Sequence, residues 1–371
     1  MLTSQLGIRL IIWAGATVPL PAPPEVLSAL TRLEVTNDAR DGDGFQITFT
    51  LAKETTEFTL VQSGVMETMN RVIIGVLMGV MPEVLIDGII TNHELTPGNE
   101  PGSSTLTVTG RDVSIMMDLE EKNESFPNQP DFLIATQLIA AYAQYGLIPT
   151  ATPTTDVPIM LDRIPRQQET DFRFIQRLAV RNGYVFYVEP LTFGVNTAYW
   201  GPEIRAGLPQ SGLAVNLGDA TNVKSLRFSN NALGPVATKG TIVEPISKST
   251  IPIPPLPSLR VPPLSTSPVT ARRTVLLRET ANRNPSSAAV AAVSSATNAP
   301  DAVTGEGELD SVRYGRVLRA RRIVGVRGAG LSYDGLYYVR KVTHSLAIGS
   351  YTQRFTLSRE GTGTITPVVV P

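Results

Sequence analysis

Residues 33–51 read LEVTNDARDGDGFQITFTL, and this stretch decides the fold class. Apolar residues alternate with polar ones at Leu33 and Val35 and again from Phe45 to Leu51, which is the period of a β-strand with one buried face. Between the two runs, residues 37–44 are dense in Asn, Asp and Gly, which tolerate the positive φ of tight turns. The stretch therefore predicts a β-hairpin and a β-rich chain.

The turn at residues 37–44 also shares some character with a calcium-binding loop, because it carries several side-chain oxygens. The full ligand spacing and the closing bidentate Glu of such a loop are missing. We therefore interpret the turn as the solvated tip of a hairpin.

Further strand patterns follow at residues 71–78, 84–95 and 104–111, with Gly and Pro between them. They predict a first antiparallel barrel or sandwich. Ahead of it, the apolar run Leu10–Ala14 precedes a cluster of prolines, which favours an edge strand running into an extended arm over a signal peptide.

Helical spacing replaces the strand pattern after Asp112. Apolar residues from Asp131 to Tyr145 recur at helical intervals before Gly146, and a second helix is expected from Thr170-Asp171 to Gly183. A strand at Tyr184–Glu189 follows, so this part of the chain predicts a small α+β insertion.

Prolines between Pro245 and Pro268 disfavour regular ladders, and residues 284–302 are rich in Ala and Ser, with little bulk to bury. We expect the latter stretch to be exposed or loosely packed. The predicted organisation is a mainly β chain made of an N-terminal strand or arm (1–29), a first barrel (30–112 and 208–245), an α+β insertion (113–207), a linker or insertion (246–310), a second barrel (311–361 with part of 265–280) and a C-terminal tail (362–371).

An internal repeat connects the first and last β blocks. Asp87-Gly88 opens a strand that reaches His93, and Asp334-Gly335 opens one that reaches His344; each is followed by a turn and a return strand. These are the only two histidines of the chain, and they fall at matching places in the two sequences. The match predicts that one chain carries two copies of one barrel.

The amino-acid composition excludes several classes of function. The 371 residues contain no cysteine, which excludes disulfides and thiolate metal sites, and their net charge of −1 supplies no overall field for a polyanion. No apolar run approaches the ~20 residues needed to cross a bilayer. The local basic cluster Arg316, Arg319, Arg321 and Arg322 alternates with apolar residues, which predicts a strand with one solvated face rather than a nucleic-acid contact.

The sequence predicts no catalytic, cofactor-binding or metal-binding residue. Both histidines lie on expected strands, and the chain has no nucleophile-elbow motif or clustered zinc ligands. Paired carboxylates for glycosidic cleavage could come only from the acidic run, which we interpret as a solvated loop face. That run comprises Asp118, Glu120, Glu121 and Glu124.

Residues 167–184, QQETDFRFIQRLAVRNGY, resemble the helix signature of phage late-control D proteins and VgrG-type baseplate hubs. Residues 337–344 and 355–361 resemble the end of the same hub region. In physical terms, Asp171 is expected to cap the helix, Phe172 and Leu178 to pack inward, and Arg177 to pair with Glu169.

The resemblance implies a homotrimer in which two tube-like antiparallel barrels per chain form a pseudo-sixfold ring. Such a ring joins a hexameric tail tube, or a tube initiator, to a trimeric spike and lines a channel for DNA, a tape-measure protein or an effector. VgrG proteins continue into a fused spike whereas this sequence stops at Pro371, so the spike is expected to be a separate chain.

The expected protein is non-enzymatic, needs no cofactor, contacts other baseplate proteins, and belongs to a virion or injection-particle baseplate assembled in the bacterial cytoplasm. Two alternatives stay open: another tail or receptor-binding virion component, and a baseplate-associated cell-wall hydrolase.

Overall fold

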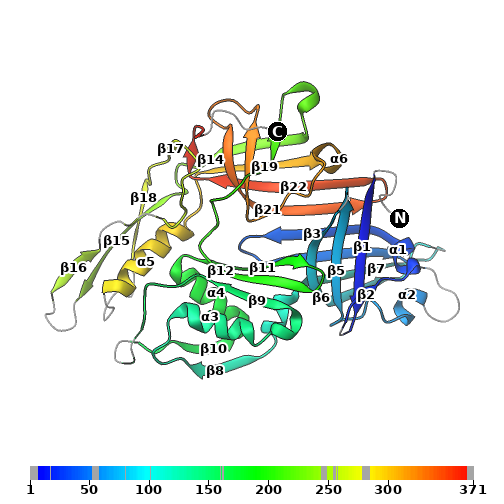
Figure 1. Ribbon diagram of the computed structural model, residues 1–371, viewed down its shortest axis with the longest axis horizontal. Helices are drawn as coiled ribbons and strands as arrows, with labels where there is room; N and C mark the ends of the chain where they lie inside the picture. Colours follow the sequence, from blue (N-terminus) through cyan, green and yellow to red (C-terminus); the bar gives the residue numbers. More distant parts are fainter. Residues whose placement is uncertain are drawn as a thin grey trace.

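A computed structural model describes residues 7–365 except 17, 52–57, 80, 101, 159, 161–162, 244–248, 254–255, 257 and 278–284. The described chain is mostly β, with 47% strand and 18% helix. One 13-stranded sheet takes strands from both ends of the chain, and its two halves have different orientations in Figure 1, where β1 and β5 run almost crosswise to β21 and β22. The predicted tail from residue 366 onward lies outside the described residues.

The first half of the sheet, which we call unit 1, has the strand order β3-β4-β7-β6-β5-β1. Its strands alternate buried and half-buried residues, as in β7, because one face covers a core of aliphatic side chains. The hairpin predicted at residues 33–51 and the strand predicted at 71–78 are confirmed. Unit 1 consists of β1 (Ile8–Gly15), β2 (Leu20–Pro21), α1 (Pro24–Ala29), β3 (Leu30–Asp38), β4 (Gly44–Thr50), α2 (Thr59–Gln62), β5 (Arg71–Met78), β6 (Met81–Thr96) and β7 (Thr105–Asp112).

The second half, unit 2, has the order β14-β19-β22-β21, continued by β20 and then β13. It encloses its own core, which includes Leu309, Tyr337 and Leu357. Unit 2 consists of β13 (Gln210–Ala214), the 3-10 turn η4 (Gly218–Ala220), β14 (Val223–Asn230), β19 (Val303–Asp310), α6 (Ser311–Tyr314), β20 (Ile323–Arg327), β21 (Gly335–Ala347) and β22 (Ser350–Arg359).

The two units share one strand order and two bulges. The β3·β4 ladder has an irregularity between Leu30 and Arg32, and the β14·β19 ladder has one between Val223 and Ser225. The β6·β7 ladder breaks between Ile90 and Asn92, and the β21·β22 ladder between Val339 and Lys341. Bulges are specific features of a strand pair, so two shared bulges in one shared strand order support the predicted internal repeat.

A further correspondence lies where β5 and β20 begin. Met69 and Arg321 both have positive φ, and each donates its backbone N–H across the sheet, to Ile90 O at 2.8 Å and to Val339 O at 2.7 Å. The units differ at one strand: β1 pairs antiparallel with β5, whereas β13 pairs parallel with β20.

The two histidines do not occupy equivalent positions. His93 lies two residues beyond the bulge of β6, and the equivalent residue of β21 is Val342. His344 therefore lies two residues further along β21 than the position that corresponds to His93. The sequence match was therefore displaced by two residues, a shift that keeps the same face of a strand and leaves the hydrophobic pattern unchanged.

The predicted α+β insertion lies between the units, below the sheet in Figure 1, with its own core around Phe174, Ile175 and Trp200. Gly146 and Gly183 have positive φ, and Gly183 ends α4 as predicted. The insertion consists of η2 (Val113–Met117), β8 (Glu121–Ser125), α3 (Asp131–Ala140), η3 (Ala143–Tyr145), β9 (Leu147–Ala151), β10 (Arg166–Thr170), α4 (Asp171–Asn182), β11 (Val185–Thr192) and β12 (Val195–Gly201).

Residues 208–245 do not rejoin unit 1, which corrects the sequence analysis. β14 pairs with β19 in unit 2, and β19 falls inside the stretch expected to be a linker. A strand with one buried face carries no sign of which partner it will meet, so the local pattern could not choose between the two halves of the sheet.

The proline-rich region is more regular than predicted. β16 pairs with β15, with Pro252 opposite Thr241; β16 is an edge strand, where a residue without an N–H is tolerated. The region contains β15 (Val236–Val243), β16 (Thr250–Ile253), β17 (Ser267–Pro268), which pairs with β23 (Gly361–Thr362), β18 (Arg273–Leu276) and α5 (Pro285–Asn298).

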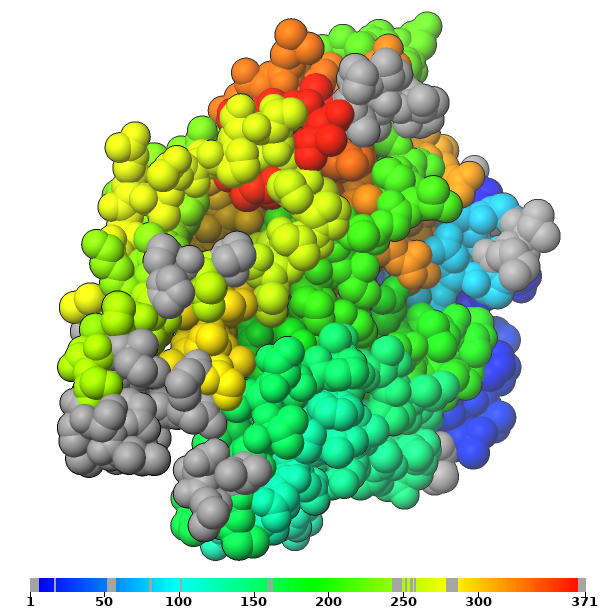
Figure 2. Space-filling model, turned by 60° about the vertical axis from the view of Figure 1, so that its left-hand side comes forward, coloured from blue at the N-terminus to red at the C-terminus, as the bar shows by residue number. Residues whose placement is uncertain are grey.

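The Ala/Ser-rich stretch forms α5, which is packed rather than loose. Ala288 and Ala292 are buried, and a Cβ placed on Gly183 would come within 3.1 Å of Ser294 Cα and of Thr297 Cβ. Small side chains let α5 approach the end of α4 closely. Figure 2 shows the residues of this region, in yellow and yellow-green, beside the green and teal α+β insertion.

Candidate functional site

Helix α4, which carries the hub-like signature, is anchored by its first buried residue. Asp171 accepts hydrogen bonds from Lys122 Nζ at 2.6 Å, Tyr142 Oη at 2.7 Å and Gln167 Nε2 at 2.7 Å. The bond to Asp171 raises the pKa of Lys122, and burial together with that carboxylate raises the pKa of Tyr142. The capping role expected of Asp171 belongs instead to Thr170, whose hydroxyl accepts from Arg173 N at 3.3 Å.

The expected pairing of Arg177 with Glu169 is confirmed, with Nε and Oε1 2.6 Å apart. The Arg177 side chain is 53% exposed, so the pair is a surface contact whose net stabilisation is small. These roles are structural.

The four arginines of residues 316–322 do not lie on a strand, because β20 begins only at Ile323. Three of them meet carboxylates from other parts of the chain: Arg319 pairs with Glu83, Arg321 with Asp43 and Arg322 with Glu189. The segment therefore ties unit 2 to unit 1 and to the α+β insertion, which corrects the expected solvated strand face.

The turn at residues 37–44 is partly buried rather than a solvated tip: Asn37, Asp38, Ala39 and Asp43 are buried, whereas Asp41 is exposed. Asp43 accepts from Asn37 Nδ2 at 2.8 Å and from both terminal nitrogens of Arg321, whose guanidinium also lies 4.3 Å from the ring centre of Tyr187. Burial opposes the charge of Arg321, but the Asp43 carboxylate raises the pKa of this arginine. A guanidinium from unit 2 thus lies among the oxygens of the turn.

A second buried ionic cluster was not foreseen from the sequence. Arg205 reaches Glu203 at 3.1 Å, Asp301 at 2.7 Å and Glu360 at 3.1 Å, and Arg260 reaches Asp301 at 3.0 Å. These residues come from four separate stretches of chain, so no local spacing could have pointed to them. A third contact, in which Arg71 pairs with Asp87 and Asn196 donates to the same carboxylate, holds the insertion against unit 1.

The two histidines have separate surroundings. His344 is buried with Nδ1 2.9 Å from Tyr351 Oη, and burial lowers its pKa to about 3. His93 is half-buried, and burial lowers its pKa as well. In the hydrogen bonds of the described residues, neither ring contacts a Ser or Thr hydroxyl that it could activate.

The acidic run is divided between a capping contact and solvent. Asp118 accepts from Thr170 Oγ1, whereas Glu121 and Glu124 are exposed on β8. Among the described residues, no group of three or more His, Cys, Asp or Glu side chains is arranged to hold a metal ion. No described helix has the length and apolar character needed to span a bilayer.

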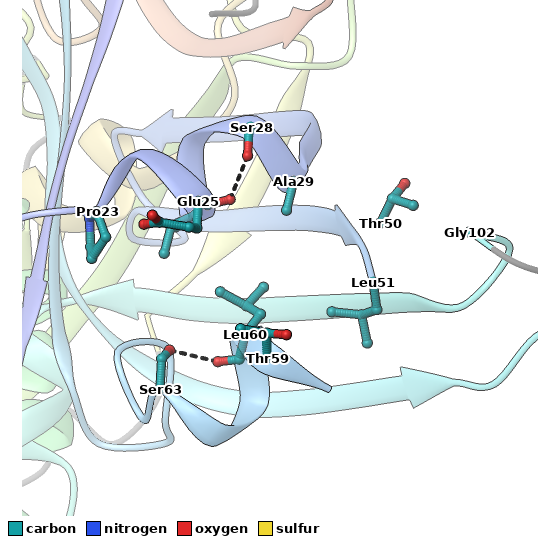
Figure 3. Close-up of a pocket in the computed structure, with 11 residues that line it drawn as sticks. Pro23, Glu25, Ser28, Ala29, Thr50, Leu51, Thr59, Leu60, Ser63 and Gly102 are labelled. Atoms are coloured by element: carbon teal, nitrogen blue, oxygen red, sulfur yellow. Dashed lines mark hydrogen bonds between the residues drawn. The ribbon is translucent and has the colours of Figure 1, made fainter. Parts of the chain in front are cut away.

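An apolar pocket of about 520 Å³ opens in unit 1 between α1, α2 and the end of β4 (Figure 3). Val26, Ala29, Leu51 and Leu60 contribute apolar surface to its lining. Ser28 and Ser63 also line it, but each hydroxyl donates to a carbonyl of its own helical segment, Glu25 O at 2.9 Å and Leu60 O at 2.7 Å.

Unit 2 has a pocket at the corresponding place, with different chemistry. Its volume is about 200 Å³, and it is lined by Asn222, Lys224, Asp310 and Arg313 among others. By the shared register, Asn222 corresponds to Ala29 and Asp310 to Thr50. Among the described residues, corresponding places in the two units therefore hold an apolar pocket in unit 1 and a charged pocket in unit 2.

No protein-family model matches the sequence, and no curated protein matches it. Solved structures do match the fold. The prophage MuSo2 43 kDa tail protein from Shewanella oneidensis superposes with a TM-score of 0.62 at 14% identity, covering 95% of this chain and 98% of that one.

A tail protein from Neisseria meningitidis MC58 gives a TM-score of 0.60 at 13% identity, with 96% and 98% covered. An Escherichia coli component of the type VI secretion system, described as structurally similar to phage T4 tail proteins, gives 0.57 at 13% identity, with 92% and 77% covered. The chain has the fold of these tail and secretion-system proteins over nearly its whole length.

Proposed function

We propose that this chain is the structural hub subunit of a phage-tail or contractile-injection baseplate. In this proposal, three copies form a ring that joins a hexameric tail tube to a trimeric spike made by a separate chain. The ring lines a channel for DNA, a tape-measure protein or an effector, and it performs no catalysis. The particle assembles in the bacterial cytoplasm, and the hub contacts further baseplate proteins.

The observation that carries the proposal is the doubled β unit. A ring of three chains closed by rotation presents six units of similar strand order, so a threefold assembly offers a nearly sixfold surface. Each unit would supply one tube-like wall of the ring. The shared fold with tail proteins supports the same reading.

The two corresponding pockets support the threefold side of the adapter. Around such a ring the apolar pocket of unit 1 and the charged pocket of unit 2 would alternate. A partner with threefold symmetry can engage one kind of pocket three times, whereas a sixfold partner must accept both. The alternation favours a trimeric partner, such as a spike, at the rim where these pockets open.

The buried ionic contacts fit a passive mechanical role. Asp43–Arg321 and the Arg205 cluster hold the units and the insertion in one arrangement, because removing either partner of a buried pair leaves an uncompensated charge. A rigid adapter transmits force between tube and spike without changing shape.

Native mass spectrometry of the purified chain, alone and co-expressed with a candidate spike from a neighbouring gene, tests the proposal. The expected result is a trimer of three times 39.9 kDa, either alone or as the hub part of a heavier complex with the spike. A monomer that ignores the spike overturns the hub assignment and favours a peripheral tail or receptor-binding component. Lysis of cell-wall material in zymography would overturn the non-catalytic role.

A further inference from the structure

The two units of one chain are joined by a single strand ladder. β3 of unit 1 pairs antiparallel with β21 of unit 2, from Lys341 opposite Asp38 to Ala347 opposite Arg32. On one face of this ladder the hydroxyls of Thr36 and Thr343 lie 3.0 Å apart. The ladder thus joins β3, the first strand of the hairpin in unit 1, to β21, the longest strand of unit 2.

Among the described residues, the strands that correspond to this pair each have an edge on which no strand ladder is found. β14 corresponds to β3, and among the described residues it pairs only with β19. β6 corresponds to β21; its residues 92–96 pair with β7 on one side, while the ladder with β5 ends at Ile89. Five of the eight residues of β14 are exposed, including Arg227, Ser229 and Asn230.

We propose that β14 of one copy pairs antiparallel with residues 92–96 of β6 in a neighbouring copy, repeating between chains the β3·β21 ladder found within the chain. The inference rests on the proposed trimeric ring and specifies how that ring closes. The shared bulges fix the register, with His93 opposite Asn230, Glu94 opposite Ser229, Leu95 opposite Phe228 and Thr96 opposite Arg227.

The chemistry of one face suits this register. Ser229 and Glu94 replace Thr36 and Thr343, so a hydroxyl meets a carboxylate that accepts its hydrogen bond. Arg227 lies diagonal to Glu94, within reach of a long side chain, and the two carry opposite charges. No like charges face each other between residues 92–96 and 227–231.

The other face would carry one apolar pair, Leu95 with Phe228, and one polar pair. Leu95 is 43% exposed in the single chain, and it would cover Phe228, whose ring stacks on Tyr333 at 4.9 Å. In this register His93 would lie opposite Asn230.

Open strand edges are templates for further pairing, and a closed ring removes them. Three β3·β21 ladders within chains and three β14·β6 ladders between chains would connect all six units into one continuous β-sheet. The occupant of both free edges is therefore a second copy of this chain.

The absence of cysteine allows a direct test by cross-linking. The double variant Glu94→Cys with Ser229→Cys, oxidised in the assembled protein, is expected to shift the denatured, unreduced band from one chain to three chains. Thr36→Cys with Thr343→Cys is the positive control, because the same geometry inside one chain should cross-link without changing the mass. Leu95→Cys with Ser229→Cys is the matched negative control, because a shift of one residue places the thiols on opposite faces.

The outcomes separate this inference from the proposed function. A native trimer that does not cross-link through residues 94 and 229 overturns the ladder and leaves the hub assignment standing. If the Leu95→Cys with Ser229→Cys control cross-links as fully as Glu94→Cys with Ser229→Cys, the proposed register is overturned. Failure of the unmodified protein to trimerise, with or without the spike, overturns both. If the variant alone fails to assemble, Leu95→Cys with Phe228→Cys tests the same register from the other face, and its failure to cross-link overturns the ladder.

Discussion

Arg321 places both terminal nitrogens of its guanidinium against the carboxylate of Asp43, 278 residues earlier in the chain. Both side chains are almost completely buried, at 3% and 2% exposure. Unit 1 and the segment that leads into β20 of unit 2 are thus held together by a contact that neither residue can leave without leaving an unpaired charge in the interior.

Arg321→Met is therefore expected to lower the free energy of unfolding by about 3–5 kcal/mol, because Asp43 stays buried without its partner. The double variant Asp43→Asn with Arg321→Met should recover much of that loss. Arg322→Met is the matched control; its pair with Glu189 is more than half-exposed at the arginine, so the expected loss is below about 1 kcal/mol. Urea denaturation measures all three, and equal losses for Arg321 and Arg322 would contradict this account.

Asp171→Asn is expected to cost about 1.5–3 kcal/mol, because the charged acceptor of the bond from Lys122 is lost inside the α+β insertion. Glu169→Gln, which removes the exposed partner of Arg177, should stay within about 1 kcal/mol. Thermal unfolding followed by the fluorescence of Trp200, which lies in the core of the insertion, reports the difference. The ranking would be refuted by a larger effect at Glu169.

Gly183→Ala is expected to destabilise the protein by at least about 2 kcal/mol, through positive φ and a Cβ pressed against α5. Gly315→Ala is a close control: it also follows a helix with φ of +69°, but nothing described lies within 4 Å of its added Cβ. Only the conformational cost, about 1 kcal/mol, should remain there. Similar losses of unfolding free energy at the two sites would show that α5 can move away from α4 to accommodate the added Cβ.

Acid should destabilise the protein through His344. Its pKa is depressed to about 3 in the folded state, so the unfolded state binds the proton first as pH falls below 6.5. The stabilisation is complete above pH 6.5 and is lost as pH falls towards 3, at about 1.4 kcal/mol per pH unit between these limits. His344→Leu with Tyr351→Phe should flatten the unfolding free energy between pH 6.5 and 4 compared with the unmodified protein. His93→Leu, at the half-buried histidine, should keep most of the slope, and an unchanged slope in the double variant would refute the assignment.

Local patterns predicted local structure well. β5 has the predicted bounds, and α4 ends at the predicted glycine, because alternation and a left-handed cap are both encoded within a few residues. The resemblance of residues 167–184 led to the fold that the solved tail proteins share.

The pairing of strands and charges that are far apart in the chain could not be predicted from the sequence. β14 meets β19 across more than seventy intervening residues, and the buried Asp43 of the turn at 37–44 meets Arg321 from a distant part of the chain. The Arg205 cluster was missed for the same reason: each charge looks like an ordinary surface residue until four stretches converge.

The β3·β21 ladder sets an order of events during synthesis. β3 is complete when residue 38 leaves the ribosome, but its partner strand ends only at residue 347. At 5–20 residues per second, β3 waits roughly 15–60 seconds with one edge unoccupied. During that interval the nascent chain offers a free edge of the kind that other nascent chains could join, so the last strands of the polypeptide protect the earliest ones from mispairing.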